Sequence, residues 1–336
     1  MCEIKSEGTT DFVCFFFHNK RTHKHKHKQM FADLHNHTTA SDGEYTPTEL
    51  VAAAHGLGTR FVGVTDHDTL EGVLSLPKEA LYEGGVVPGT EVTLRFSAEE
   101  DGYTGTCHCL VYVPPALLAS PDFVADARAT LAQARGPALV AARVARLNAC
   151  YHGPDALAAP LLATPITAAE VAALPGAPTR RHLHTVLTRN HGLDDATARA
   201  MLANDSPAYV PSGATCAELR PFFARHPQLV RVLAHPGAGS ARGPAMALYR
   251  EVLPPVDVVE RLVPRIDAAV GLDGVEVHYP AHDAALRARV LGLLRERPFL
   301  VTGGSDCHDR VKRPLGKAGL DERAFDALRS RLFGPS

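Results

Sequence analysis

Nine side chains of this chain have the types and the setting of metal ligands, because histidines and carboxylates recur in short motifs at the ends of apolar runs. They are His35, His37, Asp42, His67, Glu91, His108, His235, Asp306 and His308. Imidazole and carboxylate together favour zinc, manganese or iron as divalent ions. Nine donors exceed what one ion can bind, so the pattern predicts a cluster of two or three ions and a hydrolytic reaction.

Within this set, Glu91, Asp306 and His308 are the residues that we expect to carry catalysis. A carboxylate can bind two ions through its two oxygens, so Glu91 is predicted to bridge and Asp306 to assist. His67 or His308 would protonate the leaving oxygen only if released from metal. A ligating histidine nitrogen must be unprotonated, and we therefore expect both histidines to be ligands.

Other polar residues near the motifs leave alternatives open. Asp66 and Asp68 flank His67 and would either orient ligands or form a salt bridge or turn. Glu276 is expected near the same site as a hydrogen-bonding support. Three basic residues follow the last motif and would either grip a second phosphate or belong to a solvated loop: Lys312, Arg313 and Lys317.

The elements that must position these side chains are short β-prone runs separated by helices. The runs are 31–35, 61–67, 86–96, 106–113, 231–235, 274–279 and 299–306. Helices are predicted over 47–57, after a Thr46 cap, and over 281–297. Strand and helix in alternation indicate parallel β/α units, and in a β/α barrel the chemistry gathers at the C-terminal ends of the strands. Seven runs predict a distorted or incompletely closed barrel.

The segment between His108 and His235, roughly 125 residues, is too long for a connecting loop. It contains predicted helices at 125–149, 167–174, 181–190 and 194–203. We expect an inserted helical subdomain over 114–228 that overhangs the metal site and helps to select the substrate, between barrel parts at 30–113 and 229–336.

The first 29 residues differ from the rest. An apolar run at 12–17 is too short to span a bilayer, and a tract of alternating basic and histidine residues follows at 20–28. A tether to nucleic acid or a loose metal-binding tail is one interpretation, and a disordered extension ahead of Met30 is the one that we prefer. The charge balance, 35 basic against 37 acidic residues, gives no indication of bulk nucleic-acid binding, although local basic surface is compatible with it. Seven cysteines without a CxxC pair fit a reducing compartment, and we expect a cytoplasmic protein.

The motifs, in their order, resemble those of the polymerase and histidinol phosphatase (PHP) superfamily. The resemblance rests on His35-x-His37, Ser41-Asp42-Gly43, Thr65-Asp66-His67-Asp68, Gly89-Thr90-Glu91, Ala234-His235-Pro236 and Ser305-Asp306-x-His308. It implies a distorted seven-stranded β/α barrel and hydrolysis of phosphoesters with up to three divalent ions. It also implies that the nine residues above, His108 included, fill the nine ligand positions of the family.

The segments 274–280 and 301–306, together with the long insertion, are similar to a branch of 3',5'-nucleotide bisphosphate phosphatases that overlaps with a 5'-to-3' exoribonuclease. In that branch Arg-Pro-His opens a helix of the insertion and holds a substrate phosphate. Here the stretch reads Arg180-Arg181-His182, so the resemblance carries over Arg180 and His182 with arginine in place of the proline.

The resulting hypothesis is a phosphoesterase in which a metal-bound hydroxide attacks phosphorus in line. The expected substrate is a small phosphorylated nucleotide or a short oligonucleotide, with no membrane and no obligatory protein partner. Two alternatives stay open. One is a phosphatase for another small phosphomonoester, such as histidinol phosphate, and the other is an inactive barrel that serves as a binding module.

Overall fold

The structure is a computed structural model that describes residues 30–132, 134, 137–175, 178–243, 246–296 and 298–334. The extension expected over residues 1–29 lies outside the described residues. Among the described residues, no helix combines the length and the apolar character that a membrane crossing requires.

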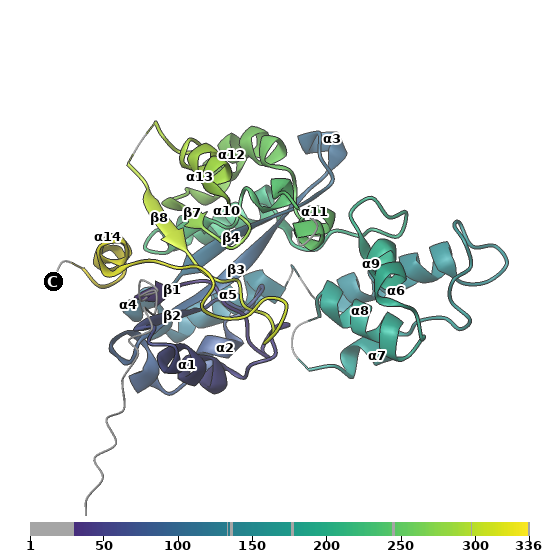
Figure 1. Ribbon diagram of the computed structural model, residues 1–336, viewed down its shortest axis with the longest axis horizontal. Helices are drawn as coiled ribbons and strands as arrows, with labels where there is room; N and C mark the ends of the chain where they lie inside the picture. Colours follow the sequence, from purple (N-terminus) through teal and green to yellow (C-terminus); the bar gives the residue numbers. More distant parts are fainter. Residues whose placement is uncertain are drawn as a thin grey trace, which may run out of the picture.

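Seven strands follow one another around a mostly parallel sheet, with helices outside it (Figure 1). In sheet order they are β1 (Ala32–Asp33), β2 (Phe61–Val64), β3 (Val86–Phe96), β4 (Gly105–Tyr112), β6 (Val230–Leu233), β7 (Gly274–His278) and β8 (Leu300–Gly303). Each lies within one residue of an expected run at its start, although several end earlier than expected. The short β5 (Ala214–Thr215) pairs with β3 beside this path.

The sheet curls until its first and last strands meet. The amide of Leu34 donates to the carbonyl of Gly303 at 3.1 Å, and the amide of Asp306 donates to the carbonyl of His35 at 2.7 Å. Gly304 permits this approach, because a Cβ at that position would lie 2.3 Å from the backbone nitrogen of His35. The expectation of a distorted seven-stranded barrel is thereby confirmed.

One strand departs from the expected parallel arrangement. β4 runs antiparallel to both of its neighbours, β3 and β6. The physical reason is the short connection from β3, in which the turn of helix α3 (Ala98–Asp101) returns the chain directly. Strands that are joined without a long crossover pair antiparallel. His108 therefore lies in the middle of its strand rather than at a C-terminal end.

Helices cover the outside of the barrel. Those of the two barrel parts are α1 (Pro47–Gly56), α2 (Glu71–Leu74), α11 (Ala247–Val252), α12 (Val256–Val270), α13 (Ala284–Leu291) and α14 (Glu322–Phe333). Thr46 caps α1 as expected, in a capping box with Glu49. The helix expected over 281–297 is shorter, because Asp283 caps its start and a turn follows Leu291.

The helices between β4 and β6 pack in two groups. They are α4 (Pro115–Leu118), α5 (Pro121–Ala132), α6 (Pro137–Tyr151), α7 (Ala168–Ala172), α8 (Arg180–Arg189), α9 (Asp195–Leu202) and α10 (Cys216–Arg225). Buried residues of α5 and α10, such as Phe123 and Phe222, belong to the same hydrophobic cluster as β3 and β4. Buried residues of α6 to α9, such as Leu147, Leu187 and Met201, form a cluster of their own.

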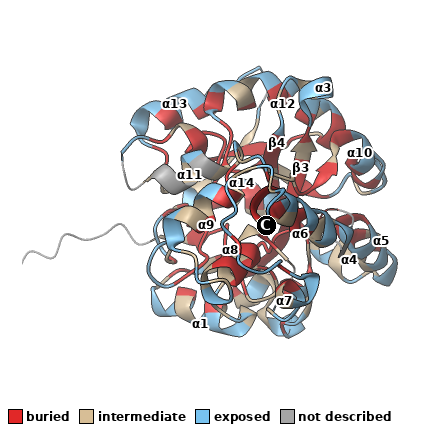
Figure 2. Cartoon of the chain, turned by 90° about the vertical axis from the view of Figure 1, so that its right-hand side faces the viewer, coloured by how far each residue is buried: buried red, intermediate tan, exposed pale blue. Residues whose placement is uncertain are grey.

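Helices α6 to α9 lie together on one side of the barrel (Figure 1). Figure 2 looks onto this side and shows buried residues in α8, which packs against α7 and α9. Because these helices bury their apolar residues among themselves, they form a compact unit between β4 and β6.

Candidate metal centre

The fold brings the nine expected ligands to one place. Ligand atoms fall into three groups in which all lie within 4.8 Å of one another. The groups are His37, Asp42, His67 and His308; His35, His37, Glu91 and Asp306; and His67, Glu91 and His108. His235 joins them through a 2.8 Å contact between its Nε2 and Oε1 of Glu91.

Glu91 lies at the middle of this cluster and is fully buried. Its Oε2 faces the ring nitrogens of three histidines, at 3.3 Å, 3.2 Å and 3.0 Å for His35, His37 and His67. Its Oε1 faces two others, at 3.0 Å for Nδ1 of His108 and 2.8 Å for Nε2 of His235. The two oxygens of one carboxylate therefore serve two separate groups of histidines.

The hairpin of β3 and β4 explains how His108 reaches Glu91. His108 pairs with Thr93, so Glu91, Thr93 and His108 share one face of the two strands. Cys107 and Cys109 point to the other face, where they are buried in the hydrophobic cluster of the barrel. Neither cysteine is therefore on the face that carries the expected ligands.

Asp306 and His308 form the other side of the centre. Oδ1 of Asp306 lies 3.1 Å from Nε2 of His37 and 3.3 Å from Nδ1 of His308. Nε2 of His308 in turn lies 3.3 Å from Oδ1 of Asp42. His235 and Asp306 both have positive φ angles, of 29° and 52°, a backbone conformation that residues with a Cβ adopt at a cost and that often marks functional sites.

The spacing of these atoms fits metal ions. Metal–ligand bonds of about 2.0–2.2 Å place neighbouring donor atoms about 3.0–3.6 Å apart, which matches most of the separations above. Three buried carboxylate oxygens have no hydrogen bond among the described residues, despite the nearby imidazoles: Asp42 Oδ1, Glu91 Oε2 and Asp306 Oδ1. Buried carboxylate oxygens that face ring nitrogens but form no hydrogen bond with them are expected where metal cations bind between these atoms.

The electrostatics of the cluster are strongly coupled. Burial acts to raise the pKa of Glu91, but His108 and His35 outweigh it, and the pKa lies well below its ordinary value. Burial acts to lower the pKa of His37, yet Asp306 and Glu91 raise it to about 9. Burial and the Arg313 cation lower the pKa of His308 to about 4. The carboxylates are thus held in the ionised form that metal ligands need.

Glu276, expected as a support, touches two of the predicted ligands. Its Oε1 lies 3.1 Å from Nδ1 of His35, and its Oε2 accepts the backbone amide of His235 at 2.8 Å. A carboxylate on the far nitrogen of a ligating histidine fixes the ring and the tautomer. Glu276 therefore leaves Nε2 of His35 to face the centre.

Asp66 and Asp68 accept hydrogen bonds from the loops and the strand around His67. Asp66 accepts bonds from the amide and hydroxyl of Thr38, both at 2.7 Å, and from the hydroxyl of Ser41 at 2.6 Å. Asp68 accepts two bonds of 2.7 Å from Thr93. Of the two alternatives for these residues, the turn role fits these contacts better.

Two residues beside Asp306 were not assigned to the metal centre from sequence. The hydroxyl of Tyr279 donates to Oδ2 of Asp306 at 2.7 Å, and Nη2 of Arg313 donates to the same oxygen. Asp306 therefore has only Oδ1 left for an ion. Tyr279 lies in the segment 274–280, and Arg313 lies in the basic loop. Neither sequence pattern identifies Asp306 as the hydrogen-bond partner, because these contacts depend on how β7 and the loop after β8 meet in the folded protein.

The two expected substrate residues open α8. Nη2 of Arg180 donates to Oδ1 of Asn204 at 2.6 Å, and its guanidinium lies 4.7 Å from the ring of Tyr209. His182 is buried. Its Nδ1 accepts the backbone amide of Thr179 at 3.0 Å, and its Nε2 lies 2.7 Å from the carbonyl of Pro175. Both ring nitrogens of His182 are thus engaged within the start of the helix.

Arg181, the residue between them, reaches toward the metal centre. Its Nη1 lies 3.5 Å from Oδ2 of Asp309, the residue that follows His308. Asp309 also accepts the backbone amides of residues 311–313 through Oδ1. Helix α8 and the loop after β8 therefore meet at this ion pair.

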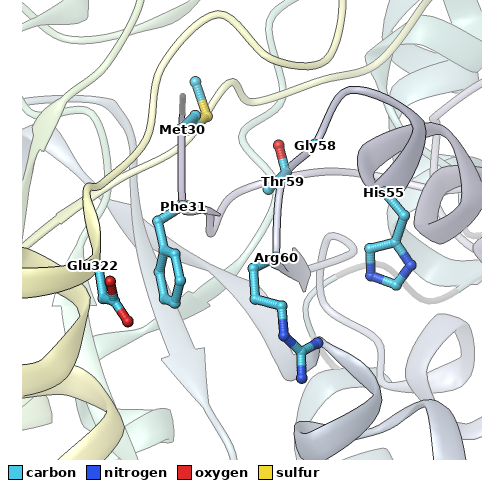
Figure 3. Close-up of a pocket in the computed structure, with 7 residues that line it drawn as sticks. All are labelled: Met30, Phe31, His55, Gly58, Thr59, Arg60 and Glu322. Carbon is cyan, nitrogen blue, oxygen red and sulfur yellow. The ribbon is translucent and has the colours of Figure 1, made fainter. Parts of the chain in front are cut away.

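A surface pocket of about 660 Å³ lies away from the metal centre, beside the residues that directly precede β1 and β2 (Figure 3). Met30, Phe31 and Thr59 line it, with Arg60 and Glu322. None of the nine expected ligands is among its lining residues, and it lies at the N-terminal ends of β1 and β2. In β/α barrels catalysis takes place at the opposite end, so this pocket is not the reactive site.

The chain is similar in sequence and fold to proteins of a known metal-dependent family. Residues 33–198 match the PHP domain family. A crystal structure of a candidate metal-dependent phosphoesterase from Bifidobacterium adolescentis has a TM-score of 0.65 and 25% identity, and the match covers 89% of this chain and 96% of that one.

Two curated proteins match shorter stretches. A 3',5'-nucleoside bisphosphate phosphatase of Chromobacterium violaceum is 30% identical over 122 residues, which is 36% of this chain and 41% of the relative. A 5'-3' exoribonuclease of Haemophilus influenzae is 51% identical over 41 residues, which is 12% of this chain and 15% of the relative. The matches thus span less than half the length of either curated relative.

Proposed function

Because the chain belongs to the PHP domain family, we propose that it is a metal-dependent hydrolase of phosphoric esters. The observation that carries this proposal is the buried Glu91 carboxylate, whose two oxygens face two different groups of histidines. Divalent ions held there would neutralise the phosphoryl oxygens and supply an activated water near neutral pH. The side chains hold and orient these groups, and none needs to act as a nucleophile.

The ligand geometry supports a division into three ion positions. The first has His35, His37, Glu91 and Asp306; the second has Glu91, His108 and His235; the third has Asp42, His67 and His308. In this assignment Glu91 would contribute to both of the first two positions. Asp306 would contribute through Oδ1, since Tyr279 and Arg313 donate hydrogen bonds to its Oδ2. Whether the ions are manganese, zinc or iron depends on supply as well as on the ligands.

For the substrate, we propose a phosphorylated nucleotide: a 3',5'-bisphosphate nucleotide or the 5' end of a short RNA or DNA. The two partial matches to nucleotide-processing enzymes support this class. In this proposal residues 114–228 form the substrate-binding insertion, Arg180 binds a phosphate, and His182 supports that contact by holding the start of α8.

The direct test is phosphate or nucleotide release by metal-reconstituted protein. The panel contains adenosine 3',5'-bisphosphate, AMP, histidinol phosphate and a 5'-phosphorylated oligoribonucleotide. We expect turnover of the bisphosphate or the oligonucleotide to exceed that of histidinol phosphate. Turnover of histidinol phosphate alone would refute the nucleotide assignment, and turnover of none would refute the esterase.

The bridging role of Glu91 has its own test. Glu91→Gln removes the charge that faces both groups of histidines, so bound metal should fall and turnover should drop by about a hundredfold or more. Asp306→Asn should also lower both. The matched control is Glu260→Gln, which changes an exposed glutamate paired with Arg289. Elemental analysis measures the metal content. If Glu91→Gln kept both the metal content and the turnover of the wild type, the bridging role would be contradicted.

A further inference from the structure

In the described part of the chain, the guanidinium group of Arg313 forms a hydrogen bond through Nη2 but none through Nε. We propose that Nε donates to a nonbridging oxygen of the substrate phosphoryl group while Nη2 holds Asp306. Arg313 is then a phosphate-binding residue of the centre. This inference deepens the proposed function and rests on it.

The donor edge of an arginine has a fixed geometry that other pairs in this protein display. Three arginines use Nε and Nη2 together to bind both oxygens of one carboxylate, with distances between 2.6 Å and 3.0 Å. They are Arg128 with Glu71, Arg225 with Asp126, and Arg289 with Glu260. Nε and Nη2 therefore point in the same direction, as the planar group requires.

Arg313 uses this edge differently. Nη2 donates to Oδ2 of Asp306, but Oδ1 of the same carboxylate faces His37 and His308 instead. Nε is buried and has no hydrogen-bond acceptor among the described residues. A buried donor without a partner destabilises the protein unless an acceptor arrives, and this donor lies on the edge that faces a predicted metal ligand.

The surrounding turn holds Arg313 in place before any substrate binds. Oδ1 of Asp309 accepts the amides of Val311, Lys312 and Arg313 at 3.0 Å, 2.5 Å and 3.0 Å. The carbonyl of Arg313 accepts the amide of His308 at 3.0 Å. A donor that is fixed in this way binds a phosphate oxygen with little loss of conformational entropy.

A phosphoryl oxygen is the acceptor that fits this donor. The esterase must place its substrate phosphoryl group against the ions, and Asp306 Oδ1 is a predicted ligand of one of them. An arginine that touches a carboxylate ligand through Nη2 can therefore reach a phosphate on the same ion through Nε. Bonds between arginine and phosphate are charge-assisted, and they exclude neutral or hydrocarbon groups from this position.

The experiment measures inorganic phosphate binding and metal content side by side, in protein reconstituted with Mn²⁺. We expect Arg313→Lys and Arg313→Gln to keep the metal content of the wild type and to bind phosphate about tenfold more weakly or worse, since one charge-assisted bond is lost. Arg310→Gln is the matched control, because Arg310 is an exposed arginine of the same loop. It should bind phosphate like the wild type.

Two results would overturn the proposal. One is unchanged phosphate affinity in both Arg313 variants, and the other is a loss of metal in proportion to the loss of phosphate, which would leave Arg313 only the task of holding Asp306. Phosphate binding needs no ester substrate. Wild-type protein that binds phosphate through Arg313 and cleaves no ester would therefore refute the proposed function alone.

Discussion

Glu91 joins the two sides of the metal centre, because each of its oxygens meets its own group of histidines. Asp306 has a different environment, with Tyr279 and Arg313 on Oδ2 and histidines on Oδ1. Two carboxylates in one cluster thus differ in which of their oxygens face histidines: both oxygens do in Glu91, whereas among the described residues the histidine contacts of Asp306 are made through Oδ1. The difference arises from the neighbours of each oxygen and not from the residue type.

Glu276 permits a prediction about support of the ligands. Glu276→Gln keeps the shape of the side chain but removes the charge beside Nδ1 of His35 and the amide of His235. We expect metal affinity to fall by about 10- to 100-fold, as for other carboxylates that orient a ligating histidine. Metal titration followed by elemental analysis measures this. Equal affinity in Glu276→Gln and the wild type would show that the contact does not tune the site.

At the scale of the elements, α8 and the loop after β8 meet through Arg181 and Asp309. Arg181 links the unit of α6 to α9 with the turn that carries Arg313. This ion pair therefore contributes to the alignment of that unit with the loop after β8.

Arg181→Ala should loosen this alignment without removing a ligand. We expect KM to rise several-fold with a smaller change in kcat and no change in metal content, because substrate positioning is affected more than the ions. Arg181→Lys should recover part of the loss. The control is Arg189→Ala, at the exposed far end of α8. An unchanged KM in Arg181→Ala would mean that the ion pair does not position the insertion.

The separate hydrophobic cluster of α6 to α9 gives a prediction about stability. Leu147 is 1% exposed within it, whereas Leu157 nearby in the sequence is 66% exposed. Leu147→Ala should lower the free energy of unfolding of this unit by about 2–5 kcal/mol, because it leaves a cavity. Leu157→Ala should change it little. Urea unfolding, monitored by limited proteolysis, would measure both effects. Equal resistance of the two variants to proteolysis at each urea concentration would contradict the assigned packing.

For the whole molecule, the metal centre connects segments that are far apart in the chain, from β1 to the loop after β8. Buried carboxylates from these segments have oxygens without a hydrogen bond among the described residues: Asp42 Oδ1, Glu91 Oε2 and Asp306 Oδ1. Bound ions would therefore stabilise the closed barrel as well as enable catalysis.

Removal of metal should test this coupling. We expect dialysis against a chelator to lower Tm by several degrees or more and to abolish turnover, and addition of Mn²⁺ or Zn²⁺ to restore both, because an ion that binds only the folded state stabilises it. Differential scanning calorimetry with and without metal is the measurement. A Tm that is insensitive to metal would argue against ion binding in the barrel.

Much of the architecture could be predicted from local patterns. The strand runs at 86–96 and 106–113 can be predicted because β-branched and apolar residues cluster there, and the start of α1 because Thr46 is a helix-capping residue. The nine predicted ligands could be singled out because their residue types recur in short motifs, which need no knowledge of distant partners.

Other features depended on segments that meet only in the folded protein. The antiparallel direction of β4, and with it the place of His108 in mid-strand, follows from pairing with β3 and β6. The contacts of Arg313 with Asp306 and of Arg181 with Asp309 join the loop after β8 to distant partners, and the unit of α6 to α9 is defined by packing. Local sequence carries the residue types and periodicities, whereas strand direction, burial and the partner of each charge are set by long-range contacts.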